Sequence, residues 1–274
     1  MKRVLSSVDK WHLEHLAKNA YAGKIRLPRT NVKILDSFEI CEGKYQCRRV
    51  EKRDDRTKVQ NFMLDNFYAI APVPVVLELF KDRKMTQYLE DELNLFCDGG
   101  VSFGIFHGDR VAGAGLNLFV EKPSQKSEYV CARDWHNRAA AFASTLSNQD
   151  PVHVWRNSQF LHLQHFCQQV IADNDAQFGL HLSCLSLADD YRGNDGITHH
   201  LIRTMCNEVW DKGGVITTVA NFTAFETNLR KHFPGKVHLL DKVPYRDLDF
   251  TIKGRKVFKP LETLDSIRYL ALIP

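Results

Sequence analysis

The sequence predicts an α/β protein that folds as one large domain. Strand-like and helix-like patterns alternate along the chain from Tyr45 onward, and the segment 180–210 joins a strand to a helix through a glycine-containing turn. The 274 residues are 44% hydrophobic, which is enough apolar material for a full core. One domain with additions therefore accounts for this length better than two domains do.

The segment 180–210 is the stretch around which the other elements are organised. A strand-like run and a short polar turn come first, and Ile197, Leu201 and Met205 then recur at helical spacing. The first turn of a helix has free N–H groups and a positive dipole end, and glycines let the backbone approach an anion closely. The turn is therefore a candidate pyrophosphate site. It lacks the Lys-Ser/Thr of the Walker pattern and the third glycine of the dinucleotide pattern.

The first half of the chain predicts a strand, two helices and a hairpin, in that order. Asp54 is a candidate N-cap for the first helix, and Pro72 and Pro74 predict a loop after it. The predicted elements are a strand at Tyr45–Val50, helices at 54–67 and Met85–Phe96, and two strands within Val101–Val120 joined by a turn at 107–110. The aromatic residues Phe62, Phe67 and Tyr68 are candidates for an apolar substrate slot or for the core.

A longer insertion occupies residues 121–179, and we expect it to shape a substrate pocket. Its predicted helices are Asp134–Leu146 and Asn157–Ala172, separated by a turn at Asp150-Pro151. On the second helix, His162, His165 and Cys167 have spacing compatible with metal ligands. The apolar residues interleaved with them favour a packed structural helix instead, so no metal site is predicted.

The last part of the chain returns to alternating strands and helices. The predicted elements are a strand at Val215–Ala220, a helix at 221–233, and strands at Val237–Val243 and Ile267–Ile273. At the other end, residues 1–44 are basic and partly amphipathic. A mitochondrial transit peptide and an extension packed on the domain both fit them, and Asp9 and Glu14 favour the packed extension. His12 and His15 lie one turn apart, and without a third ligand they are interpreted as surface residues.

The overall composition excludes several classes of protein. The net charge is +4 with both signs interspersed, which does not form the dense basic patch of a nucleic-acid-binding protein. No apolar run approaches the roughly 20 residues that a membrane span needs. Seven cysteines without a Cys-x-x-Cys pair indicate reduced thiols, so we expect a cytoplasmic protein.

The turn and the helix at 221–233 resemble two motifs of the GNAT superfamily of N-acetyltransferases. Residues 191–197, Tyr-Arg-Gly-Asn-Asp-Gly-Ile, are similar to the acetyl-CoA loop of that family, although their spacing is one residue longer. Asn221 and Ala224 are similar to the Asn-x-x-Ala start of the last GNAT helix. The order strand, two helices, hairpin and central strand is also the GNAT order. The resemblance implies a mixed, mostly antiparallel central sheet flanked by helices, with a helical insertion before the central strand.

The C-terminal segment narrows the resemblance to one branch of the superfamily. Residues 256–260, Lys-Val-Phe-Lys-Pro, are similar to a motif that follows the last helix in insect arylalkylamine N-acetyltransferases. The resemblance implies that residues 45–274 form an acetyltransferase domain, that acetyl-CoA is the co-substrate and that a small amine, such as an arylalkylamine, is the acceptor. We expect a monomer or a weak dimer that binds no nucleic acid.

The resemblance also assigns the residues that would hold acetyl-CoA. The central strand is splayed from its neighbour in this family, which frees its backbone to hold the pantetheine and polarise the thioester carbonyl. The turn and the helix start would bind the pyrophosphate, and Asn221 would lie against the cofactor. The implied cofactor-binding residues are Leu185, Ser186, Leu187, Arg192, Gly193, Asn194, Asp195, Gly196, Ile197, Thr198 and Asn221.

The candidate catalytic residues are His181 and Ser183 on the central strand. The insect glutamate position is occupied by Ala71, and the position of the family's tyrosine acid by Asn228. Vertebrate members instead relay protons through two histidines on the central strand, whose positions match His181 and Ser183 in this chain. Alternation places both on one face of the strand, and histidine titrates near neutral pH. His181 is therefore the candidate base, and a structural histidine is the alternative.

The missing glutamate and tyrosine leave a second function open. The chain could be a catalytically degenerate GNAT-fold protein that binds an acyl-CoA or a protein partner. A third interpretation, an interaction domain that retains only the fold, predicts a closed turn between Arg192 and Gly196.

Overall fold

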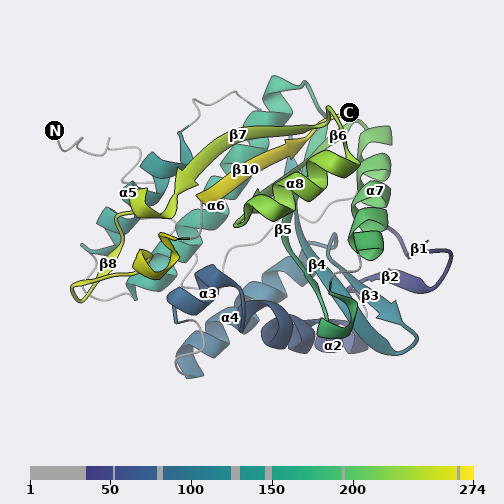
Figure 1. The fold of residues 1–274 in the computed structure, drawn as a ribbon, viewed down its shortest axis with the longest axis horizontal. Coiled ribbons are helices and arrows are strands. Elements are labelled where there is room, and N and C mark those ends of the chain that lie inside the picture. Colours follow the sequence, from purple (N-terminus) through teal and green to yellow (C-terminus); the bar gives the residue numbers. More distant parts are fainter. Residues whose placement is uncertain are drawn as a thin grey trace.

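A computed structural model describes residues 35–51, 53–78, 83–124, 130–145, 150–192, 195–263 and 266–274. Its main feature is an eight-stranded sheet (Figure 1). The strands, in their order across the sheet, are β1 (Phe38–Ile40), β2 (Tyr45–Arg49), β3 (Phe103–His107), β4 (Arg110–Glu121), β5 (Phe178–Leu187), β6 (Gly214–Ala220), β10 (Ser266–Leu272) and β7 (Val237–Pro244). Two short strands, β8 (Thr251–Ile252) and β9 (Arg255–Lys256), form a separate hairpin.

The pairing of the sheet is mixed and mostly antiparallel, as the resemblance implied. Among the described residues, β5 and β6 form the only parallel pair, and the other neighbouring strands are antiparallel. The last strand of the chain, β10, lies between β6 and β7, so β7 forms one edge of the sheet. This arrangement confirms the predicted fold class.

The helices agree with the sequence prediction except at the first proline pair and at the start of α6, which begins at Pro151 rather than at Asn157. They are α2 (Arg53–Met63), α3 (Pro72–Val76), α4 (Arg83–Asp98), α5 (Ala132–Ala143), α6 (Pro151–Asp173), α7 (Asp195–Asp211) and α8 (Thr223–His232). The loop predicted at Pro72 and Pro74 is wrong, because these residues form the short helix α3. Proline is well suited to the first turn of a helix, where its missing N–H has no intrahelical partner. The turn at Asp150-Pro151 similarly begins α6, and the Asp150 carboxylate caps the Val152 N–H at 2.9 Å.

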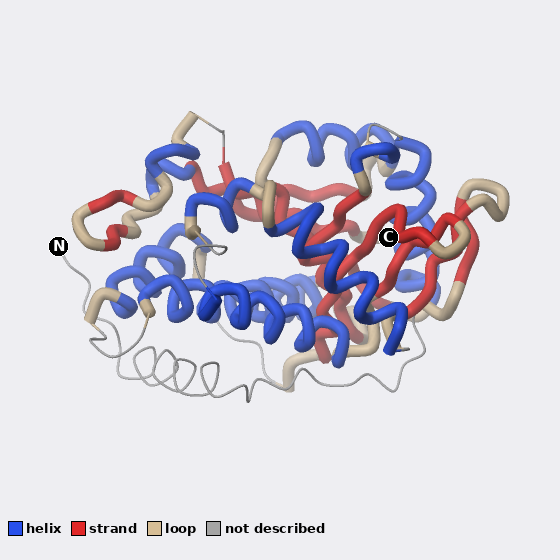
Figure 2. The backbone as a smooth tube through the Cα atoms, turned by 90° about the horizontal axis from the view of Figure 1, so that it is seen from below, coloured by secondary structure: helices blue, strands red, loops and turns tan. Residues whose placement is uncertain are grey.

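Helices cover both faces of the sheet. One apolar core contains residues of α2, α4, α5 and α6, and a second contains residues of α7 together with strand residues from the opposite face. Figure 1 shows α8 and α6 on opposite sides of β10, and Figure 2 shows the helices from the perpendicular direction. The two helices of the insertion, α5 and α6, therefore belong to the main body of the domain.

Helix α6 lies close to the central strand β5. Gly179 permits this approach, since a Cβ atom there would overlap the Sγ atom of Cys167 on α6. The side chains between α6 and β5, including those of Cys167 and Ile171, are buried as a result. The insertion thereby forms one wall above the central strand.

The region before residue 45 is only partly described. His12 and His15 lie outside the described residues, and the boundary predicted at residue 44 remains a prediction. Strand β1 lies before that boundary and pairs with β2 at the edge of the sheet. Across the described part of the chain, every helix is too short or too polar to cross a bilayer.

Candidate active site

The parallel strands β5 and β6 separate partway along their length. Their pairing runs from Phe178 and Gly214 to Leu182 and Thr218, and β5 then continues to Leu187 without β6 beside it. On its other side, β5 remains paired with β4 up to Leu187. The sheet is therefore open between β5 and β6 at the end that leads to α7.

The open edge of β5 presents backbone groups to this gap. The N–H of Ala188 donates to the carbonyl of Ala112 on the β4 side at 2.9 Å. Successive residues of a strand point their backbone groups to opposite sides, so those of Leu185 and Leu187 face away from β4. The register between β4 and β5 shifts by one residue, so Ser183 has no paired residue on β4. The strand thus has both a bulge and an edge without a neighbouring strand at this point.

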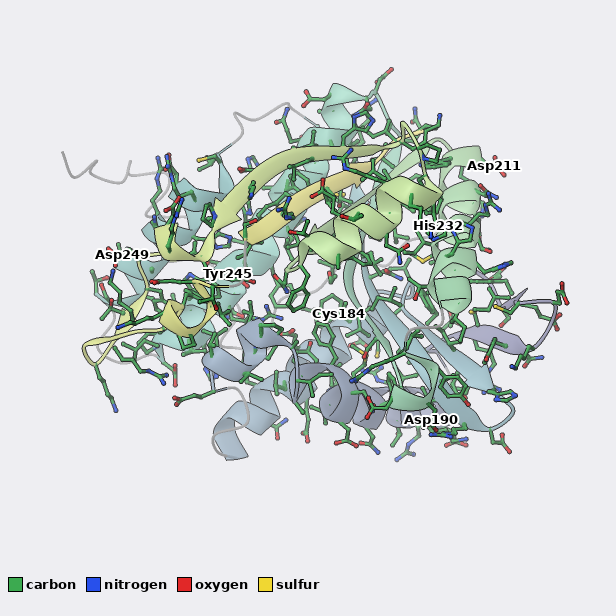
Figure 3. The ribbon with its side chains drawn as sticks, in the orientation of Figure 1. Cys184, Asp190, Asp211, His232, Tyr245 and Asp249 are labelled. Carbon is green, nitrogen blue, oxygen red and sulfur yellow. The ribbon has the colours of Figure 1, made fainter. Side chains whose placement is uncertain are left out.

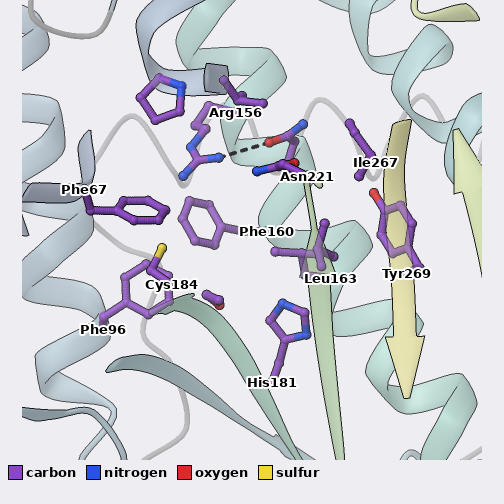
Figure 4. Close-up of a pocket in the computed structure, with 15 residues that line it drawn as sticks. Phe67, Phe96, Arg156, Phe160, Leu163, His181, Cys184, Asn221, Ile267 and Tyr269 are labelled. Carbon is purple, nitrogen blue, oxygen red and sulfur yellow. Dashed lines mark hydrogen bonds between the residues drawn. The ribbon is translucent and has the colours of Figure 1, made fainter. Parts of the chain in front are cut away.

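A pocket lies beside the open end of the two strands (Figure 4). Its space, with the mouth included, is about 690 Å³. Helix α6 forms one wall, β5 and β10 form the floor, and the segment from Phe67 to Pro74 closes another side. Cys184, which lines the pocket, lies near the centre of the molecule (Figure 3). The lining is Phe67, Val73, Pro74, Phe96, Arg156, Gln159, Phe160, Leu163, His181, Ser183, Cys184, Val219, Asn221, Ile267 and Tyr269.

His181 and Ser183 both line this pocket, where the alternation of β5 places them. The His181 side chain is fully buried, and its Nδ1 atom lies 2.8 Å from the Oγ1 atom of Thr217 on β6. Its Nε2 atom and the Ser183 Oγ atom are buried without a hydrogen-bond partner among the described residues. Two unsatisfied polar atoms at the wall of a pocket indicate a place for a polar ligand group.

Burial keeps His181 neutral. It lowers the pKa of His181 to about 3, and nearby His162 acts in the same direction. The imidazole therefore carries no charge near neutral pH, and a neutral ring can accept a proton through one nitrogen. Its titration differs from the near-neutral behaviour expected from the sequence, because the sequence does not reveal the depth of burial.

Two further histidines and a tyrosine continue the buried polar cluster under α6. The Nε2 atom of His136 lies 2.7 Å from the hydroxyl of Tyr269, and His162 Nε2 lies 3.2 Å from the carbonyl of Val130. Burial lowers the pKa of His162 to about 4 and that of His136 well below its usual value. Burial also raises the pKa of Tyr269, so its phenol stays protonated at the pocket wall.

The predicted cofactor residues on β5 occupy the open edge. Leu185 and Leu187 present backbone groups to the gap, whereas the Ser186 hydroxyl donates to the carbonyl of Asn66 at 2.9 Å. Arg192 donates to the carbonyl of Leu187 at 3.1 Å and to that of Asn66 at 3.3 Å. Its guanidinium also pairs with Asp189 at 2.6 Å. Arg192 therefore fixes the end of β5.

The carbonyl of Asn66 is available because α2 ends in a π-helical turn, Leu64–Tyr68. Such a turn shifts the backbone hydrogen-bond pattern and frequently occurs at functional sites. Here it connects the pocket residue Phe67 to the end of the central strand through Ser186 and Arg192. Asn66 and this turn were not predicted from the sequence.

The predicted pyrophosphate site lies at the start of α7. Gly196 and Thr198 are half-buried in its first turn, and Ile197 is fully buried, so only its backbone can contact a ligand. Gly193, Asn194 and the side chain of Asp195 lie outside the described residues. The first-turn N–H groups of an α-helix have no intrahelical acceptor, which suits them to an anion.

Asn221 follows β6 and lines the pocket. Its Oδ1 atom accepts a hydrogen bond of 3.1 Å from the hydroxyl of Tyr245. Asn221 thus lies across the gap between β5 and β6 from Leu185. The buried Tyr245 fixes the orientation of its amide.

The pocket also contains residues that the sequence did not indicate. Arg156 and Gln159 are polar groups on α6, and Tyr269 comes from the last strand. Of the aromatic residues proposed for a slot, Phe67 lines the pocket, whereas Phe62 and Tyr68 are packed in the core. Arg156 is the single arginine or lysine of α6, which was the available signal, but its partner Glu92 lies far away in the sequence.

His162 on α6 is packed among aromatic side chains. Within the described parts of the chain, no three His, Cys, Asp or Glu side chains are arranged to hold a metal ion. The His162 ring instead packs on Trp135 and Tyr269 at centroid distances of 5.3 and 5.1 Å. This agrees with the interpretation of α6 as a packed helix.

The sheet, its open parallel pair and the helices on both faces define the GNAT fold. Comparison with solved structures shows this fold in N-acetyltransferases over most of the chain. The polyamine N-acetyltransferase of Drosophila melanogaster, which forms N-acetylagmatine, is 15% identical with a TM-score of 0.57, covering 84% of this chain and 100% of its own. Arylalkylamine N-acetyltransferase 2 of Aedes aegypti is 15% identical with a TM-score of 0.58, covering 84% and 98%.

A third structure extends the range of related proteins. The C-terminal condensation domain of Ebony, in complex with β-alanyl-dopamine, is 16% identical with a TM-score of 0.53, covering 83% of this chain and 98% of its own. The TM-scores of these structures show a shared fold, and at identities of 15–16% the similarity is one of fold alone. No family model matches the sequence, and no curated protein matches it significantly.

Proposed function

We propose that the protein transfers an acetyl group from acetyl-CoA to the primary amine of a small aromatic amine, by direct attack in a ternary complex. The observation that carries this proposal is the open end between β5 and β6. The edge of β5 that has no partner on β6, with the backbone of Leu185 facing the gap, lies between the end that leads towards α7 and an apolar pocket. One surface thus offers places for an acyl carrier and for an acceptor.

The residues present fit acetyl-CoA as co-substrate. The backbone of Leu185 and the N–H of Leu187 would hold the pantetheine, as an additional strand pairs with an open edge, while the Leu187 carbonyl accepts from Arg192. The N–H groups at Gly196, Ile197 and Thr198 would bind the pyrophosphate. Asn221 would flank the pantetheine from the other side. Bound in this way, acetyl-CoA supplies an activated thioester next to Ser183.

The acceptor amine must be neutral before it can attack. The Nε2 atom of His181 is buried, faces the pocket wall and has no partner among the described residues. The hydrogen bond between its Nδ1 atom and Thr217 orients the ring. As the amine nitrogen bonds to the acetyl carbon and the C–S bond breaks, we assign His181 the acceptance of the amine proton, directly or through a water at Ser183, and its transfer on to the departing CoA thiolate. Fixing both reactants in one pocket supplies a further part of the rate.

The lining of the pocket favours an aromatic acceptor. Phe67, Phe96, Phe160 and Leu163 provide apolar walls, and aromatic rings pack favourably against one another. The solved structures of this fold include enzymes named for arylalkylamines and for polyamines. The apolar walls support the first of these two classes for this chain.

Calorimetric titration with CoA and acetyl-CoA, together with a thiol-release assay over a series of amines, tests the proposal. We expect micromolar binding of acetyl-CoA and turnover with phenethylamine-type acceptors. Binding without turnover of any amine would favour the degenerate acyl-CoA-binding protein. Absence of binding would overturn the proposed function.

A further inference from the structure

We propose that Arg156 determines which amines the pocket accepts. It selects an acceptor whose far end carries a hydrogen-bond-accepting oxygen, and it disfavours an acceptor that ends in a second cation. This inference rests on the proposed acetyl transfer, because it assigns the acceptor end of the same pocket.

The guanidinium of Arg156 is held in one position. Its Nη2 and Nε atoms donate to the two carboxylate oxygens of Glu92 at 2.8 and 3.2 Å. Glu92 Oε1 also accepts a hydrogen bond of 2.6 Å from the Tyr68 hydroxyl. The side chains of Arg156 and Glu92 are 14% and 1% exposed. A bidentate pair with this degree of burial fixes both the place and the plane of the guanidinium.

Arg156 retains donors that the protein does not use. A guanidinium has five N–H groups, and Glu92 accepts from two of them. Gln159 Oε1 accepts from Nη1 at 3.1 Å, as the dashed line in Figure 4 shows. Among the described residues, these three bonds leave one N–H on each Nη atom. Because Arg156 and Gln159 both line the pocket, the remaining donors are available to a ligand oxygen there.

The charge balance of the pocket disfavours a second cation. Arg156 is the single charged side chain among the lining residues that the structure describes, and no aspartate or glutamate lines the pocket. The carboxylate of Glu92 lies behind Arg156 and already accepts three hydrogen bonds. A terminal ammonium or guanidinium would therefore lose its hydration and meet a positive group. An oxygen acceptor would gain a charge-assisted hydrogen bond instead.

Arg156 and the candidate base His181 line the same pocket. It precedes His162 by six residues on α6, which is about 9 Å along the helix axis. His162 in turn lies close enough to His181 to lower its pKa. Figure 4 shows Arg156 and His181 at opposite ends of the pocket, with Phe160 between them. A phenethylamine with its amine at His181 would direct its ring towards Phe160 and its far end towards Arg156.

Three amines that differ at the far end test the inference. Phenethylamine has no polar group there, tyramine has a phenolic oxygen, and agmatine has a guanidinium. A hydrogen bond to a charged donor raises the binding affinity by about tenfold or more. We expect tyramine to exceed phenethylamine by about tenfold in kcat/KM and in affinity, and agmatine to fall below phenethylamine by at least about tenfold.

Two variants connect these differences to Arg156. Arg156→Lys keeps the positive charge beside Glu92 but removes the planar set of donors, so the protein is expected to fold. The preference for tyramine over phenethylamine should fall to about twofold, mainly through KM. Gln159→Leu removes the side-chain oxygen that accepts from Arg156 and leaves the ion pair between Arg156 and Glu92 unchanged. The control is Arg133→Lys at an exposed position on α5, which should leave all three amines unchanged.

The readouts separate this inference from the proposed function. Amine binding is measured by calorimetry both with and without CoA, and folding is checked by thermal unfolding. Equal binding of the three amines, equal preference in Arg156→Lys and wild type, or no amine binding under either condition would overturn the inference. Turnover of phenethylamine with no preference for tyramine would overturn this inference alone. The expected order of binding without any acetyl transfer would support it while overturning the proposed function.

Discussion

The Nδ1 atom of His181 lies 2.8 Å from the Oγ1 atom of Thr217, and the two residues are direct neighbours in the parallel register of β5 and β6. The hydroxyl holds the imidazole with its other nitrogen at the pocket. On β5, Cys184 at the pocket wall follows His181 by three residues. The His181–Thr217 pair therefore lies at the inner end of the gap between the two strands.

Replacing Thr217 by valine removes the hydroxyl and keeps the β-branched shape. We expect Thr217→Val to lower kcat by about tenfold, because the imidazole loses its fixed orientation, with the affinity for acetyl-CoA unchanged. Steady-state kinetics and calorimetry measure the two effects. Thr218→Val is the matched control, since the Thr218 hydroxyl donates to the Leu182 carbonyl at 2.9 Å and does not contact His181. Equal losses in both variants would indicate a general packing effect.

Replacing His181 tests the base directly. His181→Asn should lower kcat by about 10- to 100-fold. Because burial lowers the pKa of His181 to about 3, the residue remains neutral throughout the neutral range. The loss should therefore be similar at about pH 6 and about pH 8, which pH–rate profiles of both proteins measure. A wild-type inflection near pH 6.5 that disappears in His181→Asn would contradict a buried neutral base.

The first turn of α7 is tested at its glycine. Gly196→Leu places a bulky side chain where the backbone is proposed to approach the pyrophosphate, so the Kd for CoA should rise by about tenfold or more. Calorimetry with CoA measures this change. Thr204→Ala, at a half-buried position away from the first turn of the same helix, controls for helix stability. Unchanged affinity in Gly196→Leu would place the pyrophosphate elsewhere.

The buried histidines predict that the protein loses stability in acid. Burial lowers the pKa of His136, His162 and His181, whereas each would titrate near its ordinary value in the unfolded chain. Above about pH 6.5 both states bind the same number of these protons, and the contribution of the neutral rings to stability is complete. As the pH falls towards the folded values, about 4 for His162 and about 3 for His181, the unfolded state binds more protons and stability is lost.

Urea unfolding at a series of pH values measures this slope. With three histidines contributing, the free energy of unfolding should fall by up to about 4 kcal/mol per pH unit below pH 6. In His181→Asn the slope should correspond to about one fewer proton taken up on unfolding. His238→Ala, on the exposed face of β7, should leave it unchanged. A slope that is identical in all three proteins would show that His181 titrates normally.

Local patterns determined the elements that form the central part of the fold. The strand β5 and the helix α7 were predicted within two or three residues, because the change from a strand pattern to helical spacing is visible in neighbouring residues. The short helix α3 was not predicted, because proline serves both as a helix breaker and as the first residue of a helix.

The sequence by itself determined the α/β class, the order of the elements and the face of β5 that carries His181 and Ser183, because these depend on spacing along the chain. Only the tertiary structure decided what surrounds that face. The Thr217 hydroxyl, the carbonyl of Asn66 and the pairing of Glu92 with Arg156 come from elements distant in the sequence. The low pKa of His181 likewise depends on burial by the packed helix α6, and burial is a property of three-dimensional packing.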